Sequence, residues 1–283
     1  MIADLRHLYL ETVKRSVAGL THESAYELRP AEFEGSVLRR VNGAVRAGVG
    51  IAGRLTAQEL ALVRRIDEDQ RREGGPWPLV GETMIGARRL DHLQRSVEAI
   101  LAAGTPGDLI ETGVWRGGAA IMMRAVLAAH QVADRKVWLA DSFSGVPAPD
   151  PERHPADAGY KLHRYDELAV SVERVRANFA RYDLLDDQVE FVVGRFRDTL
   201  PRLQGHRWSL IRLDGDLAEA THDALENLYP SLSPGGIVIV DDYGAVRACR
   251  RAVQEFRSAY GVREPIERID DSAISWTRAP LTG

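Results

Sequence analysis

The sequence predicts an α/β fold with a doubly wound, mostly parallel sheet and a helical N-terminal extension. From about residue 88 onward, apolar segments of strand length alternate with amphipathic segments of helix length. The first strand is followed by a glycine-rich turn before a helix, and two later strands each end in a pair of aspartates. Strands that alternate with helices form parallel sheets, because each crossover helix returns the chain to the same end of the sheet.

Residues 1 to 78 are expected to form the helical extension. Apolar residues recur at positions i, i+3 and i+4 in residues 5–14 and again in residues 56–66, which predicts two helices. A turn-rich stretch at residues 73–78 then separates this extension from a second unit, residues 79–283.

The second unit alternates helices and strands. Each expected helix carries an apolar stripe, and each expected strand is a short apolar run bounded by turn residues. In chain order we expect a helix at 88–103, a strand at 107–111, a helix at 119–130, strands at 137–141 and 189–193 around a helix at 169–182, strands at 208–213 and 236–240 around a helix at 219–228, a helix from 243 to about 260, and a strand at 274–278. An irregular, proline-rich segment at about 142–165 interrupts the alternation.

The composition is that of an ordinary globular protein. Of its 283 residues, 45% are hydrophobic and 28% are charged, and no apolar run approaches the ~20 residues of a membrane span. The first residues lack the basic start and apolar block of a secretory signal, so we expect a cytoplasmic protein without a membrane partner. A formal net charge of −4 argues against a nucleic-acid partner. The single cysteine, Cys249, excludes an internal disulfide, and we expect it to pack in the core.

Two apolar strands each end in a pair of carboxylates. The four acids are Asp214, Asp216, Asp241 and Asp242. If the two strands are neighbours in a parallel sheet, all four acids meet at the edge where open α/β sheets bind ligands. Because like charges repel, such a cluster usually needs a divalent cation, a shared proton or basic neighbours. A single aspartate there can simply cap the following helix, but this explanation suits all four much less well.

The glycine-rich turn begins with an acid. Its sequence is Glu-Thr-Gly-Val-Trp-Arg-Gly-Gly at residues 111–118, and glycines let the backbone turn sharply and approach a ligand before a helix N-terminus. The spacing is not the G-x-G-x-x-G of dinucleotide enzymes. It resembles the adenosylmethionine loop of class I methyltransferases, in which a carboxylate before the turn faces the cationic end of the cofactor. Such a turn can also be purely structural.

Acids also follow the two strands at 137–141 and 189–193. Asp141 ends the first of them, from where a carboxylate can accept hydrogen bonds from both ribose hydroxyls of an adenosine. Asp198 follows the second in a short polar loop, where nucleotide-binding folds often contact adenine. Either acid can instead cap the next turn or helix. Together with the glycine-rich turn, they favour a ligand that contains adenosine.

Five runs resemble the macrocin O-methyltransferase (TylF) family. They are Glu-Thr-Gly-Val-Trp-Arg-Gly-Gly (111–118), Asp-Ser-Phe-Ser-Gly-Val-Pro (141–147), Leu-Leu-Asp-Asp-Gln-Val (184–189), Arg-Leu-Asp-Gly-Asp (212–216) and Asp-Asp-Tyr (241–243). The resemblance extends from about residue 8 to residue 278. It implies a class I methyltransferase fold, S-adenosylmethionine and Mg²⁺ as cofactors, and methylation of a sugar hydroxyl on a bacterial natural product.

Carried over by position, the resemblance implies that Asp214, Asp241 and Asp242 hold the metal. It also places Asp216 near the substrate hydroxyl as a general base, with Asp214 beside it in the catalytic group. Mg²⁺ prefers near-octahedral oxygen ligation, which leaves sites for water and two sugar oxygens. A coordinated hydroxyl has a lowered pKa, and a nearby carboxylate can take its proton.

The resemblance further implies a set of cofactor-binding residues in the segment at 83–86, in the glycine-rich turn and after the strands. These residues are Thr83, Met84, Glu111, Thr112, Gly113, Trp115, Gly117, Asp141, Ser142, Phe196, Asp198 and Asp214. The irregular segment at about 142–165 would be a lid over a glycosylated substrate, and His163 within it is a second candidate base. Residues 1–78 would complete the substrate pocket and join copies of the chain in a homodimer or larger homo-oligomer.

Three other interpretations stay open. A catechol-like phenolic acceptor also presents two vicinal oxygens to a metal in this geometry. A metal-dependent phosphotransferase or hydrolase could use the same acids, although the turn after Glu111 lacks the Gly-Lys-Ser/Thr of a P-loop. A catalytically silent binding subunit would have no physical need to hold four acids together. No motif identifies the sugar, its methylated hydroxyl or the aglycone.

Overall fold

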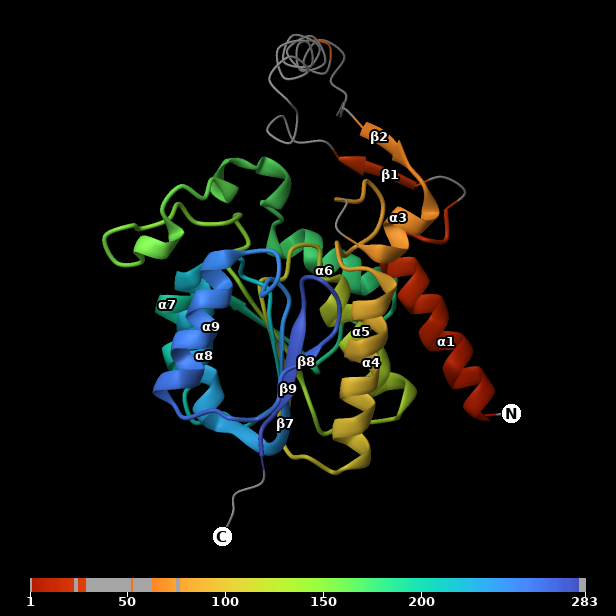
Figure 1. Ribbon diagram of the computed structural model, residues 1–283. Coiled ribbons are helices and arrows are strands. Elements are labelled where there is room, and N and C mark those ends of the chain that lie inside the picture. The colour runs from red at the N-terminus through yellow and green to blue at the C-terminus, as the bar shows by residue number, and fades with distance from the viewer. Residues whose placement is uncertain (1, 23–24, 29–51, 53–62, 75–76, 280–283) are drawn as a thin grey trace.

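This computed structural model describes residues 2–22, 25–28, 52, 63–74 and 77–279, and within them seven strands form one central sheet (Figure 1). The strand order is β5-β4-β3-β6-β7-β9-β8. The strands are β3 (Asp108–Thr112), β4 (Val137–Asp141), β5 (Val189–Val193), β6 (Trp208–Leu213), β7 (Leu232–Val240), β8 (Glu267–Arg268) and β9 (Ile274–Thr277). The first five in spatial order pair in parallel, and β9 and β8 join antiparallel. The predicted mostly parallel sheet is confirmed.

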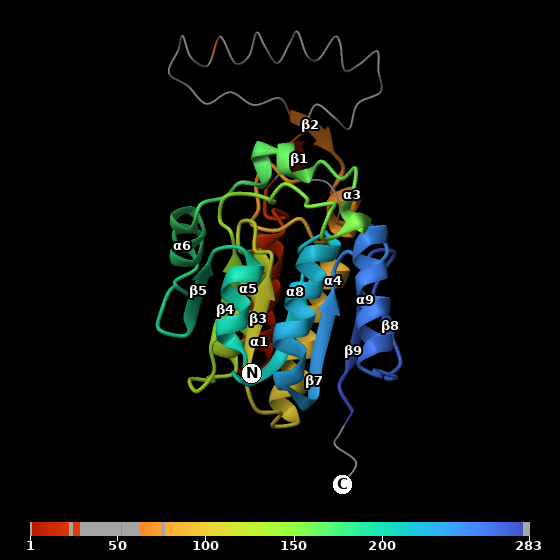
Figure 2. The same ribbon diagram turned by 90° about the vertical axis from the view of Figure 1, so that its left-hand side faces the viewer.

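Helices cover both faces of the sheet (Figures 1 and 2). One face carries α1 (Ile2–Val17), α4 (Ala87–Ala102), α5 (Gly118–Ala129) and α6 (Val172–Arg181), and the other carries α7 (Phe196–Thr199), α8 (Ala218–Leu228) and α9 (Arg247–Ala259). Cys249, on α9, is buried in the core, as predicted. Helix α5 is apolar on nearly all sides because it lies between the sheet and two other helices. None of the helices in the described residues is long and apolar enough to cross a membrane.

The irregular segment at about 142–165, named the lid segment here, contains short 3₁₀ turns at Pro155–Asp157 and Leu162–Arg164. A third turn, Asp166–Leu168, follows it. Helix α6 begins only after it, at Val172, three residues later than the predicted start. The reason is Ser171, whose side chain accepts a hydrogen bond from the backbone N–H of Arg174 and so caps the helix.

The N-terminal extension is only partly helical. The helix predicted at residues 5–14 is confirmed as part of α1. The helix predicted at residues 56–66 is wrong over its last turn, because Val63–Ile66 is strand β2, paired antiparallel with β1 (Ala25–Leu28); residues 56–62 lie outside the described residues. The pairing is supported by an ion pair between Arg64 and Glu27 at 2.6 Å, which local helical periodicity does not reveal. Helix α3 (Glu68–Glu73) follows.

The extension shares the core of the sheet unit, since α1 packs on α5 and buries Leu10, Val13 and Val17 in the same apolar cluster. The boundary predicted at residue 78 and the expected contacts between copies stay predictions.

Candidate active site

Asp214 and Asp241 leave the sheet side by side. Strands β6 and β7 pair in parallel with Leu213 opposite Val240, so the residues that follow emerge at the same level. The backbone N–H of Asp241 donates to the carbonyl of Leu213 at 2.9 Å, which continues the ladder past both strand ends. The prediction that the two acid-tipped strands are neighbours is confirmed.

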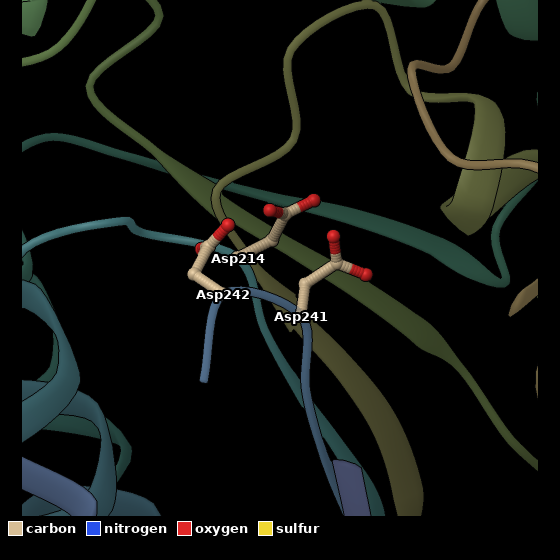
Figure 3. Close-up of side chains that lie close together, drawn as sticks. All are labelled: Asp214, Asp241 and Asp242. Carbon is tan, nitrogen blue, oxygen red and sulfur yellow. The ribbon is translucent and has the colours of Figure 1, made fainter. Parts of the chain in front are cut away.

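Three of the four acids form one compact cluster (Figure 3). Asp214, Asp241 and Asp242 each offer a carboxylate oxygen, and these oxygens lie within 4.8 Å of one another. Asp216 lies close by, since its backbone N–H donates to Oδ2 of Asp242 at 3.1 Å. Asp216 has a φ of +60°, a strained value for a residue with a side chain, and it places the backbone N–H within reach of Asp242.

A buried arginine pairs with two members of this cluster. Arg212, within β6, is 2% exposed. Its Nη1 lies 2.7 Å from Oδ2 of Asp214 and its Nη2 lies 2.7 Å from Oδ1 of Asp241. Nη1 also donates to Oε1 of Glu111 at 2.5 Å, so one guanidinium joins the glycine-rich turn to the acid cluster. Arg212 was not predicted as a site residue, although a charge inside a mostly apolar strand is a signal that it must be paired.

A second arginine completes the pairing of Asp241. Arg89, in the first turn of α4, donates to Oδ2 of Asp241 and to Oδ2 of Asp270, both at 2.6 Å. Each carboxylate oxygen of Asp241 therefore has its own arginine. The sequence carried no sign of this contact, because Arg89 reads as an ordinary polar position of an amphipathic helix.

The cluster still holds more negative charge than its arginines offset. Among the described residues, no lysine, arginine or histidine pairs with Asp216 or Asp242. Burial, followed by the neighbouring carboxylates, raises the pKa of Asp242 well above its usual range and the pKa of Asp216 to about 7. Burial raises the pKa of Asp214 to about 6 even though Arg212 opposes it. A donor set of carboxylate oxygens with excess negative charge fits a hard divalent cation such as Mg²⁺.

A pocket of about 420 Å³ lies beside these acids, between the glycine-rich turn, the lid, α8 and the segment before α4. Most of the predicted site residues line it. They are Thr83, Met84, Glu111, Gly113, Trp115, Asp141, Ser142, Phe196, Asp214, Asp216, Asp241 and Asp242.

Glu111 lines this pocket and carries an unsatisfied oxygen. Its Oε1 is bonded to Arg212, but its Oε2 is buried and has no hydrogen-bond partner among the described residues. Burial raises the pKa of Glu111 to about 8, against the attraction of Arg212. A buried carboxylate oxygen without a partner is costly, and a cationic ligand group would satisfy it.

Gly113 lets the glycine-rich turn contact the end of β6. Its φ is +89°, and a Cβ there would lie 1.9 Å from the carbonyl oxygen of Asp214. No side chain can occupy this position without displacing Asp214.

Asp141 both lines the pocket and shapes the turn. Its Oδ2 accepts from the backbone N–H of Val114 at 2.7 Å and its Oδ1 from that of Phe143 at 2.8 Å. Burial raises the pKa of Asp141, although these backbone hydrogen bonds favour the ionised form. Carboxylate oxygens accept more than one hydrogen bond each, so these contacts leave acceptor capacity for ribose hydroxyls.

Trp115 connects the turn to the segment after the lid. Its indole N–H donates to the carbonyl of Glu167 at 3.0 Å. The backbone there has a φ of +48°, which is rare for an aromatic residue and turns the ring toward the pocket that it lines.

Four predicted residues do not line the pocket. Thr112 is buried and its Oγ1 donates to the carbonyl of Arg212 at 3.4 Å, while Gly117 acts as the left-handed N-cap of α5. The Asp198 side chain is 63% exposed on α7. His163 is exposed in its 3₁₀ turn, although its neighbour Leu162 lines the pocket. Contacts of Asp198 with a cofactor and of His163 with a substrate stay predictions.

Two further acids near the pocket, Asp157 and Asp223, were not predicted as site residues. Asp157 of the lid is fully buried, and its two carboxylate oxygens accept from the backbone N–H groups of Ala218 and Glu219 at 2.7 and 3.0 Å. It therefore caps α8 from a distant segment. Asp223 of α8 lines the pocket, and burial and Glu219 raise its pKa to about 6.

Comparison with known proteins gives consistent matches. The family model described as Macrocin-O-methyltransferase (TylF) matches residues 6–278. The chain is 56% identical over 211 residues to the 8-demethyl-8-(2,3-dimethoxy-alpha-L-rhamnosyl)-tetracenomycin-C 4'-O-methyltransferase of Streptomyces olivaceus, which covers 74% of this chain and 80% of that protein. It is 42% identical over 275 residues to the mycinamicin III 3''-O-methyltransferase of Micromonospora griseorubida, which covers 96% of each.

Among solved structures, the O-methyltransferase NovP is similar to nearly the whole chain. The match has a TM-score of 0.82 and 39% identity, and it covers 97% of this chain and 100% of that one. The predicted fold class is confirmed by this likeness.

Proposed function

Because this chain belongs to the macrocin O-methyltransferase (TylF) family, we propose that it methylates a sugar hydroxyl of a glycosylated natural product. The family and the relatives establish that it is a methyltransferase. Two relatives are named for methylation at the 4' position of a rhamnosyl tetracenomycin and at the 3'' position of a mycinamicin. The observation that carries the proposal is the cluster of Asp214, Asp241 and Asp242 beside a pocket that contains the unpaired Glu111 oxygen.

S-adenosylmethionine is the proposed methyl donor. Its ammonium group would meet Oε2 of Glu111, which has no partner within the described chain. Its ribose would meet Asp141, whose carboxylate is held in place by two backbone N–H groups. Because both acids are positioned before a ligand arrives, little ordering is left to the binding step.

Asp214, Asp241 and Asp242 would hold Mg²⁺. When bound, the ion supplies positive charge that lowers the pKa of an acceptor hydroxyl. The protein contributes the fixed positions of the three carboxylates, two of which are held by Arg212 and Arg89.

Asp216 is the proposed general base. It lines the same pocket as the acid cluster, and its pKa of about 7 is close to the pH at which a base works best. In the proposed reaction the acceptor oxygen forms a bond to the methyl carbon of adenosylmethionine as the carbon–sulfur bond breaks. The hydroxyl proton passes to the Asp216 carboxylate, and adenosylhomocysteine leaves. Alignment of the oxygen, carbon and sulfur by the pocket walls accounts for the remaining acceleration.

The sharpest test of the metal assignment is Asp242→Asn. Asp241 and Asp214 are paired with arginines, so their replacement also unbalances buried charge, whereas no described cation pairs with Asp242. We expect Asp242→Asn to fold normally, to lose calorimetric binding of Mg²⁺ and to lose turnover. Asp271→Asn, at a fully exposed acid, is the matched control and should behave as wild type. Full turnover by Asp242→Asn, or by wild type in EDTA, would reject the metal-dependent mechanism.

The acceptor class is tested by mass spectrometry with purified protein, adenosylmethionine and Mg²⁺. Deoxysugar glycosides and free catechols are offered side by side. We expect one added methyl group on the sugar of a glycoside. Methylation of catechols alone would replace the sugar acceptor with a phenolic one.

A further inference from the structure

An irregular stretch of chain forms one wall of the pocket. We name residues 78–85 the covering segment; its Glu82, Thr83, Met84 and Ile85 line the pocket. It has no helix or regular strand of its own, so its backbone carbonyl groups must find partners elsewhere. Those partners show what holds the wall in place.

A single buried arginine donates hydrogen bonds to the carbonyl groups at the C-terminal end of the covering segment. Arg71, on α3 of the N-terminal extension, is 1% exposed. Its Nη2 donates to the carbonyl of Thr83 at 2.6 Å and, at 3.4 Å, to that of Ile85, while Nη1 donates to that of Met84 at 3.2 Å. The Nε atom donates to the carbonyl of Ala18, just beyond α1, at 2.6 Å. One side chain thus joins the extension to three consecutive pocket residues.

The charge of Arg71 is not balanced by an acid. No carboxylate among the described residues pairs with Arg71, and burial alone lowers its pKa to about 10. Burying an unpaired cation is costly, so the guanidinium is not a source of ion-pair stability. What it offers is geometry, because its rigid fork directs several N–H donors in one plane, which a lysine ammonium cannot do.

The other end of the covering segment is held from the glycine-rich turn. Arg116 donates through Nη1 to three carbonyl groups, those of Pro78 at 2.9 Å, Leu79 at 3.3 Å and Gly81 at 3.0 Å. The backbone N–H of Gly118 donates to the carbonyl of Glu82 at 2.8 Å. The covering segment is therefore bonded to the turn on one side and to the extension on the other. The bonds to the extension run through Arg71 and through the backbone N–H groups of Glu82 and Thr83, which donate to the carbonyl of Val17 at 2.8 and 3.2 Å.

We propose that Arg71 is a positioning residue for the methyl-donor site, which fixes Thr83 and Met84 against the pocket and makes donor affinity depend on the N-terminal extension. This inference rests on the proposed function, because it assumes that the pocket binds adenosylmethionine. Arg71 itself does not line the pocket. It acts through the backbone of residues that do.

The test compares Arg71→Met, Arg71→Lys and the control Arg72→Met. Arg72 is the next residue of the same helix, but it is exposed, and its one ion pair among the described residues is with Glu68. We expect both Arg71 variants to raise KM and the calorimetric Kd for adenosylmethionine about tenfold or more, since small misplacements of binding groups have effects of this size. The Kd for Mg²⁺ should not change, because the acid cluster makes no contact with Arg71. Arg72→Met should match wild type in all three constants.

If Arg71 only stabilised the fold, its variants would change different constants. In that case the Arg71 variants would lose thermal stability and active fraction, and kcat would fall while KM and Kd for adenosylmethionine stayed at wild-type values. That result would overturn the inference. If Arg71→Met does not fold, Arg71→Lys decides: faster amide hydrogen exchange in the covering segment together with weaker donor binding supports the inference, and wild-type exchange with wild-type Kd overturns it.

A separate result would show that the proposed function itself is wrong. Wild-type protein that binds no adenosylmethionine would contradict the proposed function. The exchange comparison between Arg71→Lys and Arg72→Met needs no ligand, so unchanged exchange in the covering segment would reject the positioning role on its own.

Discussion

The Nη2 atom of Arg212 donates to Oδ1 of Asp241 at 2.7 Å, and the two side chains are only 2% and 6% exposed. The same guanidinium also bonds Glu111, the acid of the glycine-rich turn. One buried cation therefore serves the proposed metal site and the proposed methyl-donor site. Because Glu111 and Asp241 bond the same guanidinium, we expect a substitution of either acid to change the electrostatics of both sites.

Arg212→Met should destabilise the protein severely. It leaves the buried Glu111 and Asp241 and the partly exposed Asp214 without their shared cation, and breaking a buried ion pair by removing one partner costs about 3 to 5 kcal/mol. Denaturant unfolding measures this loss. The matched control is Arg251→Met, which breaks only an exposed ion pair with Glu255 and should change stability by less than about 1 kcal/mol. Equal stability of the two variants would show that Arg212 does not hold the cluster.

Binding of Mg²⁺ should strengthen as the pH rises from about 6 to about 8, because metal ligands must be deprotonated. The pKa of Asp214 is raised to about 6, that of the adjacent Asp216 to about 7, and that of Asp242 well above its usual range. At the lower pH, protons occupy part of the cluster and compete with the ion. Calorimetric titration with MgCl₂ at both pH values checks this, and an affinity that does not vary with pH would contradict it.

Asp223→Asn should stabilise the protein at high pH only. Burial and Glu219 raise the pKa of Asp223 from 3.8 to about 6, so folding favours the protonated form of this residue. Its contribution to the free energy of unfolding of the wild type is therefore complete below about pH 4 and is lost as the pH rises through about 6. Because the residue is partly solvated, we expect the variant to gain about 1 kcal/mol at about pH 8 and nothing at about pH 4. Thermal unfolding at the two pH values measures the difference. Asp134→Asn, at an exposed acid outside the pocket, should follow wild type at both, and an equal gain in both variants would exclude the burial of Asp223 as the cause.

Asp157→Ala should release the lid from α8. The variant removes both acceptors from the first N–H groups of that helix, and loss of a helix cap costs about 1 to 2 kcal/mol. We expect faster proteolysis within residues 142–165 and a higher KM for the acceptor. Asp150→Ala is the control, since the Asp150 side chain accepts from the backbone N–H groups of Glu152 and Arg153 within the lid itself and, among the described residues, does not bond to α8. Wild-type proteolysis of Asp157→Ala would mean that the lid is anchored by its apolar contacts.

The parts of the fold that were predicted correctly depend on local pattern. The alternation of apolar strands and amphipathic helices after residue 88 led to the parallel sheet, and the positions of Asp214 and Asp241 at strand ends led to their meeting at one edge. The prediction that failed, helical structure over the last turn of residues 56–66, rested on helical periodicity in a segment outside that alternation. There the cross-strand pairing of Val63–Ile66 with Ala25–Leu28 decides the structure, and that pairing joins segments far apart in the chain.

The sequence alone was sufficient for the main alternation of strands and helices after residue 88, the acid-tipped strands, the glycine-rich turn and the family. Tertiary structure decided which charges meet: Arg212 with Glu111 and Asp241, Arg89 with Asp270, Arg71 with the covering segment, and Asp157 with α8. The physical reason is that a buried polar group must be paired, which a pattern of residues can indicate, whereas the identity of its partner depends on contacts between distant segments that form only when the chain folds.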